Sequence, residues 1–284
     1  MVTGVGWGKI HSPDNNSKHD DNFSSMAIGY SPRSMSSSES TPALAFAQVT
    51  KRYGAGPLVL ERISFAVRAG EFFGLAGVNG AGKTSLIKCL LDLSDFSSGQ
   101  ISIFGDSSAR FAARRHLAYL PERFMPPHYL SGRSFLKMMA ALHGHPHDDS
   151  RALAMFDELD LEASALTRPV RAFSKGMTQK LGLAAAFLAN RKLMILDEPM
   201  SGLDPKARAR VKDRLFALRA NGGTLFFTSH ALADVEEICD RIAVLHEGHI
   251  AFIGPPRDLV GATGAATLER AFLHVIESRA TIDA

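Results

Sequence analysis

The chain has 284 residues, of which 45% are hydrophobic, and its formal net charge is +3. This length and hydrophobic content suffice for one large α/β domain, or for one domain with a small insert, and they exclude disorder of the whole chain. Because the charge is small and the Lys and Arg residues are scattered, the composition gives no support to nucleic-acid binding.

The sequence shows no segment of the kind that enters or crosses a membrane. No stretch approaches the roughly 18 consecutive apolar residues of a spanning helix, and the N-terminus lacks the apolar segment of a secretory signal. The two cysteines, Cys89 and Cys239, lie in apolar, helix-like surroundings without CxxC spacing, which predicts reduced thiols in the core. We therefore expect a cytoplasmic protein.

Residues 1–42 differ in composition from the rest of the chain. They are rich in Ser, Asp, Asn and Gly and show no sustained apolar periodicity, which predicts a disordered leader. The alternative is a start codon assigned too early, with Met26 or Met35 as the true first residue, and the sequence does not decide between the two.

The folded region begins at Ala43, where short β-rich runs alternate with Gly and Pro turns. Helices are expected after Pro205 and after His230. Between two groups of strands, residues 126–190 change to helical spacing. The expected fold is therefore α/β, with a mixed sheet assembled from both sides of an inserted helical subdomain. The predicted strands are at residues 44–49, 63–67, 72–76, 101–104, 193–196, 224–228, 242–245 and 250–253.

The inserted helices contain apolar residues at helical spacing. These residues are Phe135, Leu136, Met138, Met139 and Leu142 in one helix and Leu153, Met155, Phe156 and Leu159 in the next. We expect the pair Met138 and Met139 to belong to the helix core rather than to a ligand-binding surface.

Three closely spaced histidines, His143, His145 and His147, together with Asp148, raise the question of a metal site. Gly144 and Pro146 interrupt this run, so the four side chains do not share one helix face. An exposed loop is therefore favoured over a metal site.

The sequence GVNGAGKT at residues 77–84 lies between the strand predicted at 72–76 and a helix-like stretch at 85–91. This is a P-loop in the context that the motif requires. Its glycines let backbone N–H groups converge on phosphate oxygens, and the helix N-terminus adds a favourable dipole. Lys83 would contact the β- and γ-phosphates and Thr84 would offer its hydroxyl to Mg²⁺. The expected nucleotide-binding residues in this segment are Asn79, Gly80, Ala81, Gly82, Lys83, Thr84 and Ser85.

Two adjacent carboxylates, Asp197 and Glu198, follow the apolar strand at 193–196. Acidic residues that end a strand are usually solvated turn residues, but a nearby P-loop favours a magnesium-dependent phosphate site. Asp197 would then orient the shell of Mg²⁺ ligands. Glu198, on the opposite side of the strand, would accept a hydrogen bond from the attacking water and act as its general base.

Before these carboxylates, residues 173–180 have the sequence FSKGMTQK and resemble the signature motif of ABC transporter ATP-binding subunits. The other motifs of that family are also present, in the family's order along the chain. They are Tyr53 at the aromatic A-loop position, Glu122 at the Q-loop position, residues 201–204 as D-loop, and His230 as switch histidine. The resemblance covers roughly residues 43–256 and implies the P-loop NTPase ABC cassette fold, with ATP and Mg²⁺ as cofactors. Residues 257–284 would form a C-terminal helical extension that packs on the core or assists dimerisation.

The resemblance also implies how the site is assembled. Two chains, identical or related, would pair head to tail, with ATP between the P-loop of one chain and Ser174 and Gly176 of the other. Tyr53 would stack on adenine, and His230 would contact the γ-phosphate. The implied catalytic residues are Lys83, Glu198 and His230; the implied metal ligands are Thr84, Glu122 and Asp197; and the implied nucleotide contacts beyond the P-loop are Tyr53, Glu122, Ser174, Gly176 and Asp204.

Two positions depart from the commonest pattern of this family. Glu122 stands where many members have Gln, which adds negative charge near Asp197 and Glu198. Residues 175–177 have the sequence Lys-Gly-Met in place of Gly-Gly-Gln, a form that resembles exporter ATPases of the ABC-2 type. That resemblance implies a partner permease at the inner face of the cell membrane, docked on residues 129–133, and transport directed outward.

Two other functions remain as alternatives. One is an ABC ATPase that acts on DNA or ribosomes, but the sequence contains each motif once and no long insert between Lys83 and Ser174. The other is a regulatory cassette that binds ATP without hydrolysing it, which the presence of Asp197, Glu198 and His230 argues against. The transported substrate is not encoded in recognisable residues of this chain.

Overall fold

The computed structural model describes the backbone of residues 41–280 and the side chains of residues 41–277. Most of the leader predicted at 1–42 therefore lies outside the described residues, as do both alternative start positions. Within residues 41–280, no helix is long and apolar enough to cross a membrane.

A six-stranded sheet forms the centre of the molecule, in the order β10-β9-β3-β8-β7-β6. All neighbouring strands are parallel except β10, which runs antiparallel to β9. Every residue of β3, β7 and β8 is buried, as expected for parallel strands covered on both faces. The strands are β3 (Phe72–Ala76), β6 (Leu117–Leu120), β7 (Leu193–Asp197), β8 (Thr224–Thr228), β9 (Arg241–His246) and β10 (His249–Gly254).

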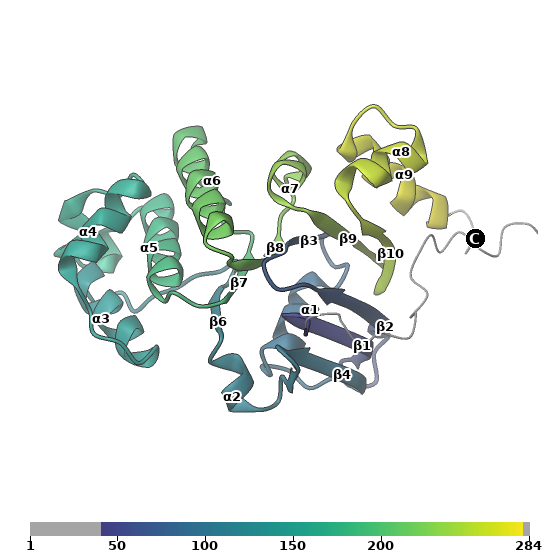
Figure 1. Cartoon of the computed structure of the whole chain (residues 1–284), viewed down its shortest axis with the longest axis horizontal. Coiled ribbons are helices and arrows are strands. Elements are labelled where there is room, and N and C mark those ends of the chain that lie inside the picture. The colour runs from purple at the N-terminus through teal and green to yellow at the C-terminus, as the bar shows by residue number, and fades with distance from the viewer. Residues whose placement is uncertain (1–40, 281–284) are drawn as a thin grey trace, which may run out of the picture.

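A second sheet is antiparallel and has the order β2-β1-β4-β5. Its strands are β1 (Leu44–Arg52), β2 (Leu58–Val67), β4 (Ser98–Ile103) and β5 (Asp106–Ser107). Helix α1 (Lys83–Leu90) contributes to the same buried core as both sheets. In Figure 1 this sheet lies beside the central one, next to α1.

Four phenylalanines join the two sheets through stacked rings. Phe46 and Phe65 come from the antiparallel sheet, and their ring centroids are 4.5 Å apart. Phe65 stacks on Phe73 of β3 at 5.2 Å, and Phe73 stacks on Phe226 of β8 at 6.1 Å. Aromatic rings bury large areas in fixed geometries, so this stack fixes the antiparallel sheet on the strand that precedes the P-loop.

The helical insert forms a lobe at one end of the molecule, and α8 and α9 lie at the other end (Figure 1). The helices of the lobe are α3 (Gly132–Leu142), α4 (Asp149–Glu158) and α5 (Lys175–Leu188), with 3₁₀ turns at Ala163–Leu166 and Val170–Ala172. The other helices are α2 (Phe111–Arg114), α6 (Pro205–Ala220), α7 (Leu232–Ile238), α8 (Pro256–Thr263) and α9 (Leu268–Ala280). Leu268 and Ala271 of α9 are fully buried, so this helix packs on the main core.

Close packing at Gly182 fixes α5 on the central sheet. A Cβ atom at this position would lie 2.6 Å from Leu120 Cδ1 and 2.8 Å from Phe124 Cδ1, distances that side chains do not tolerate. Leu120 ends β6 and Phe124 follows two residues after Glu122. The position of the segment that contains Glu122 is therefore set by contact with α5.

Met138, which was expected in the helix core, is exposed, as are two other apolar residues of the insert. Met138 is 36% exposed, Leu142 74% and Leu153 39%, whereas Phe135 and Leu136 are buried and Met139 is partly buried. The expectation for Met138 was wrong because α3 is covered on one side only, and Met138 lies on its uncovered side. Cys89 and Cys239 are both buried and free.

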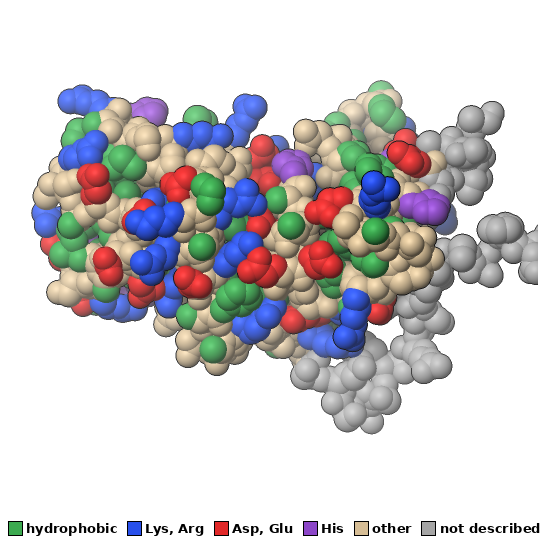
Figure 2. Space-filling view, turned by 90° about the horizontal axis from the view of Figure 1, so that it is seen from above, with side chains coloured by type: hydrophobic (Ala, Val, Ile, Leu, Met, Phe, Trp, Pro, Cys, Tyr) green, Lys and Arg blue, Asp and Glu red, His purple; other side chains and the backbone are tan. Residues whose placement is uncertain are grey.

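On the face shown in Figure 2, Lys and Arg side chains alternate with Asp and Glu side chains and do not gather in a basic patch. Ion pairs join α6 and α7. Arg208 and Lys212 of α6 both contact the buried carboxylate of Asp234 in α7. Because α6 follows residues 201–204 and α7 follows His230, these pairs hold the two segments before the helices in a fixed relation.

Candidate functional site

The loop at residues 77–82 connects the carboxyl end of β3 to α1, and two glycines set its shape. Gly80 and Gly82 have φ angles of 84° and 109°, which side chains other than glycine rarely adopt. At Gly82 a Cβ atom would also lie 2.8 Å from Leu60 Cδ2. Lys83 begins the helix, and its ammonium group donates to the carbonyl oxygens of Gly77 at 2.6 Å and Val78 at 3.2 Å.

The two carboxylates lie at the carboxyl end of β7, beside the carboxyl end of the parallel strand β8, where α/β proteins place their ligand sites. Asp197 is the last residue of β7 and is 2% exposed. Its Oδ1 atom accepts a hydrogen bond of 2.6 Å from the hydroxyl of Thr228, which ends β8. The same hydroxyl accepts a bond of 3.0 Å from the backbone N–H of Glu198.

Glu198 has a left-handed backbone with a φ angle of 50°. Such a conformation costs a residue other than glycine on the order of 1–3 kcal/mol and persists only where its surroundings hold it. Its Oε2 atom accepts from the backbone N–H of His230 at 3.2 Å. The Oε1 atom is buried and lies 3.3 Å from His230 Nε2, without a hydrogen bond.

These residues surround one open cavity of about 340 Å³. The structure thus gathers most of the predicted P-loop residues, both carboxylates, Glu122 and His230 in one place. The lining consists of Val59, Asn79, Gly80, Gly82, Lys83, Thr84, Ser85, Glu122, Asp197, Glu198 and His230. Ala81 is not among them, because its side chain is buried in the core and its N–H donates to the Val78 carbonyl at 3.2 Å.

Burial shifts the ionisation of all three central groups of the cavity toward the neutral form. It lowers the pKa of Lys83, an effect opposed by Glu198, Asp197 and Glu122. It raises the pKa of Asp197, against the hydrogen bond from Thr228, and also the pKa of Glu198, against the charge of His230. The carboxylates are therefore incompletely compensated within the chain.

This arrangement fits a hard divalent cation. Thr84, Glu122 and Asp197 bring oxygen atoms to the same cavity, and oxygen is the ligand that Mg²⁺ prefers. A cation beside these residues would also supply the positive charge that the buried carboxylates lack.

Tyr53 lies next to the cavity but does not line it. Its hydroxyl donates to the Ser85 hydroxyl at 3.3 Å, its side chain is exposed, and the ammonium of Lys51 lies 4.5 Å from its ring centroid. One face of the ring thus makes a cation–π contact.

The remaining predicted site residues lie away from the cavity. Ser174 is exposed and caps the N-terminus of α5, where its hydroxyl accepts from the N–H of Met177 at 3.2 Å. Asp204 is exposed and caps α6 by accepting from the N–H of Ala207 at 2.9 Å. Within one chain, neither of these side chains nor Gly176 belongs to the lining of the cavity.

Known proteins resemble this chain over most of its length. The family model described as ABC transporter matches residues 60–201. A Nod factor export ATP-binding protein I of Burkholderia thailandensis is 37% identical over 228 residues, which cover 78% of this chain and 73% of that relative.

The chain belongs to the ABC transporter ATP-binding family. It is also 40% identical to an uncharacterized ABC transporter ATP-binding protein of Synechocystis, over 71% of this chain. That match spans 58% of the relative, less than two thirds of its length. A solved structure of the ATP binding subunit of an ABC transporter superposes with a TM-score of 0.74 at 32% identity, covering 82% of this chain and 99% of that one. The likeness confirms the expected ABC cassette fold.

Two buried residues of this ABC cassette, not among the predicted site residues, bond to the site or to the turn beside it. One is Thr228, which bonds to both carboxylate residues. The other is Gln179 of α5, whose amide donates to the carbonyl of Pro199, directly after Glu198, at 2.9 Å. A polar residue at the end of the apolar run at residues 225–227 was the available signal for Thr228. Gln179 lies within the signature segment 173–180, but nothing in that segment indicates a contact with Pro199.

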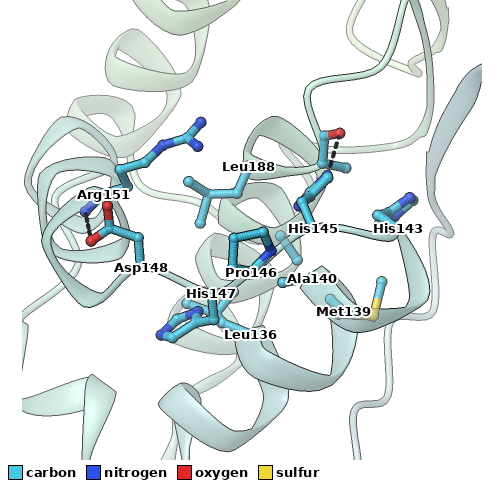
Figure 3. Close-up of a pocket in the computed structure, with 12 residues that line it drawn as sticks. Leu136, Met139, Ala140, His143, His145, Pro146, His147, Asp148, Arg151 and Leu188 are labelled. Atoms are coloured by element: carbon cyan, nitrogen blue, oxygen red, sulfur yellow. Dashed lines mark hydrogen bonds between the residues drawn. The ribbon is translucent and has the colours of Figure 1, made fainter.

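Residues 143–148 form the expected loop between α3 and α4, which is exposed at Gly144, Pro146 and Asp148. His143, His145 and His147 are each partly buried, and they border a small hollow between α3, α4 and α5 (Figure 3). His145 Nε2 lies 3.2 Å from the Ala189 carbonyl oxygen, and Arg191 donates to His143. The loop folds onto the end of α5 because these polar contacts hold it there. Among residues 41–280, no group of three or more His, Cys, Asp or Glu residues has a geometry that could hold a metal ion.

Proposed function

We propose that this chain is the ATP-hydrolysing subunit of an ABC transporter, which pairs with a second ATPase chain and drives export through a partner permease of the ABC-2 type. The observation that carries the proposal is the division of the site. One half is assembled within the chain, while the exposed Ser174 and the half-buried Gly176 do not belong to it. A second chain, placed head to tail, would bring these two residues to the phosphate end of the cavity.

The residues of the cavity have chemical roles that follow from their positions. The backbone of residues 79–82 and the dipole of α1 would hold the phosphates, and the ammonium of Lys83 would exchange its two carbonyl partners for phosphate oxygens. Mg²⁺, when bound, neutralises charge on the β- and γ-phosphates, and Thr84, Asp197 and Glu122 are the residues that would hold it.

Glu198 is suited to the role of general base. Its Oε1 atom is a buried acceptor without a hydrogen bond, and an attacking water could supply the missing donor. Burial raises the pKa of Glu198, which strengthens it as a proton acceptor. His230 holds Oε2 through its backbone N–H, while its imidazole Nε2 lies 3.3 Å from Oε1 and would turn from this carboxylate to contact the γ-phosphate.

The proposed permease contact lies after the Q-loop position. Met125 and Tyr129 are each 79% exposed, and large exposed apolar side chains mark interaction surfaces. The segment 129–133 follows Glu122 closely, so a permease bound there would place the whole chain at the inner face of the membrane. The direction of transport is supported by the relative named for Nod factor export.

The substitution Glu198→Gln tests the proposal. It removes the proton acceptor while keeping the shape of the side chain, so the variant should bind ATP with Mg²⁺, fail to hydrolyse it, and accumulate as a dimer in size-exclusion chromatography with light scattering. The exposed Glu247 provides the control, because Glu247→Gln should hydrolyse ATP normally and remain monomeric. A Glu198→Gln variant that turns over ATP at the wild-type rate, or that stays monomeric and free of nucleotide, would refute the proposal.

A further inference from the structure

Thr228 contacts both carboxylate residues of the site through one hydroxyl group. It stands opposite Asp197 in the register of β7 and β8 and is fully buried. The hydroxyl donates to Asp197 Oδ1 at 2.6 Å and accepts from the N–H of Glu198 at 3.0 Å. A hydroxyl has one proton to donate, and here that proton is directed to Asp197.

The bond to Asp197 fixes the orientation of its carboxylate. Oδ1 is occupied by Thr228, so the group cannot rotate freely. Hydrogen bonds to an ionised acceptor are shorter and stronger than neutral ones, and a length of 2.6 Å is in the range expected for them. The orientation of Asp197 toward the cavity is therefore set from the neighbouring strand.

The bond to Glu198 fixes a strained backbone. The N–H of Glu198 is held by the Thr228 hydroxyl and, at 3.3 Å, by the Thr228 carbonyl. On the far side of the residue, its own carbonyl accepts from the N–H of Ser201 at 3.1 Å. A left-handed glutamate relaxes when such contacts are removed, and its side chain would then move away from the cavity.

We propose that Thr228 is a positioning residue of the ATPase reaction, which aligns Asp197 with the metal-binding oxygens and Glu198 with the attacking water. This inference rests on the proposed function. A purely structural role would require only that the hydroxyl be paired inside the protein. The proposed role requires in addition that metal affinity and turnover depend on it.

The strand itself offers a matched control. Thr224, at the other end of β8, is 1% exposed, and its hydroxyl accepts from the N–H of Gly70 at 2.9 Å. The substitutions Thr228→Val and Thr224→Val each replace a buried, hydrogen-bonded threonine by a residue of the same shape. Only the first of them removes contacts to the site. Thr228→Ser keeps the hydroxyl and serves as the conservative variant.

Three quantities are measured on the full chain: kcat and KM for ATP, Mn²⁺ binding in the presence of ATP by electron paramagnetic resonance, and ATP binding without metal. For Thr228→Val we expect kcat to fall by about tenfold to 100-fold, because small misplacements of reacting groups slow a reaction by such factors. We also expect Mn²⁺ to bind at least about fivefold more weakly. Binding of ATP without metal should be unchanged. Thr228→Ser should stay within about twofold of wild type, and Thr224→Val should change only the melting temperature.

If Thr228→Val keeps the wild-type kcat and Mn²⁺ affinity, or if Thr224→Val loses as much as Thr228→Val does, the inference is wrong. Should Thr228→Val fail to fold, Thr228→Ala removes the same hydroxyl with less steric demand and is judged by the same measurements. A wild-type chain that neither hydrolyses ATP nor binds Mn²⁺ with ATP would overturn the proposed function itself. An active wild type with an equally active Thr228→Val would overturn only the role of Thr228.

Discussion

The two halves of the proposed site differ in how the chain holds their polar groups. In the P-loop half, Lys83, Asp197 and Glu198 are 7%, 2% and 6% exposed. In the other half, Ser174 and Asp204 are exposed and bond only to the first turn of their own helices. A buried charge is stable only if the chain supplies partners for it. An exposed helix cap is solvated by water and needs no such partners. The first half is thus prepared by folding, and the second is available for contact with another molecule.

The largest expected effect comes from a substitution in the P-loop half. Lys83→Ala removes the ammonium that would meet the phosphates, and we expect ATP turnover to fall by at least about 10²–10³-fold, as for other groups that stabilise a transition state. Steady-state phosphate release measures this. Lys88, exposed on the same helix, gives the control Lys88→Ala, which should keep wild-type turnover. A Lys83→Ala variant with more than a tenth of wild-type activity would contradict the assignment.

A change in the exposed half should separate nucleotide binding from dimerisation. In a Glu198→Gln background, Ser174→Asp keeps a good helix cap but places a negative charge where the γ-phosphate would approach. We expect the ATP-held dimer to weaken by at least about tenfold, with ATP binding to the monomer unchanged, as measured by light scattering and a fluorescent nucleotide. Ser131, which caps α3 in the same way, provides the control: Ser131→Asp should keep the dimer. Equal dimer loss in both variants would indicate a capping defect instead.

A moderate effect is expected at Tyr53, which lies beside the cavity. Base stacking on an aromatic ring contributes on the order of 1 kcal/mol or more, so Tyr53→Ala should weaken ATP binding by about fivefold to tenfold. Tyr53→Phe loses only the bond to Ser85 and should bind nearly as wild type. Isothermal titration calorimetry distinguishes them, and equal affinities of Tyr53→Ala and wild type would rule out the stacking role.

The smallest effect concerns stability. It tests whether the buried charge of Glu198 lowers the free energy of unfolding. Burial raises the pKa of Glu198 above its value in the unfolded chain, so the ionised side chain destabilises the fold at pH values above the folded pKa. This cost disappears below the unfolded pKa. Near pH 8, Glu198→Gln should therefore melt above wild type without nucleotide, by about 2–4 °C for each kcal/mol relieved. The difference should close as the pH falls toward the ordinary carboxyl range. A lower melting temperature at pH 8, or a difference independent of pH, would contradict this.

The sequence predicted those parts of the fold and site that depend on local pattern. The loop at 77–84 and the carboxylates after β7 follow from contiguous residues whose geometry is fixed by the strand and helix beside them. The strand predicted at 63–67 begins at Leu58 in the structure, because pairing with β1 extends it beyond the local signal. Met138 was placed wrongly because apolar spacing does not show which side of a helix is covered.

Contacts between distant segments could not be predicted from the sequence. Thr228 meets Asp197 only because β8 lies next to β7 in the sheet, and nothing local specifies that neighbour. The half-buried state of His145 likewise depends on the end of α5, far along the chain, coming to lie beside it. The separation of Ser174 from the cavity is also a property of the assembled fold, although the family resemblance anticipated it.

The hydrogen bond between Gln179 and the Pro199 carbonyl has a mechanical consequence for the proposed pair of chains. It fastens α5 to the turn directly after Glu198. In such a pair, the first turn of α5 would touch the nucleotide held by the opposite chain, while Glu198 would act on the nucleotide held by its own. A shift of α5 would then move both its contact with the opposite chain's nucleotide and the turn beside Glu198. Hydrolysis at either nucleotide site would therefore affect the other site.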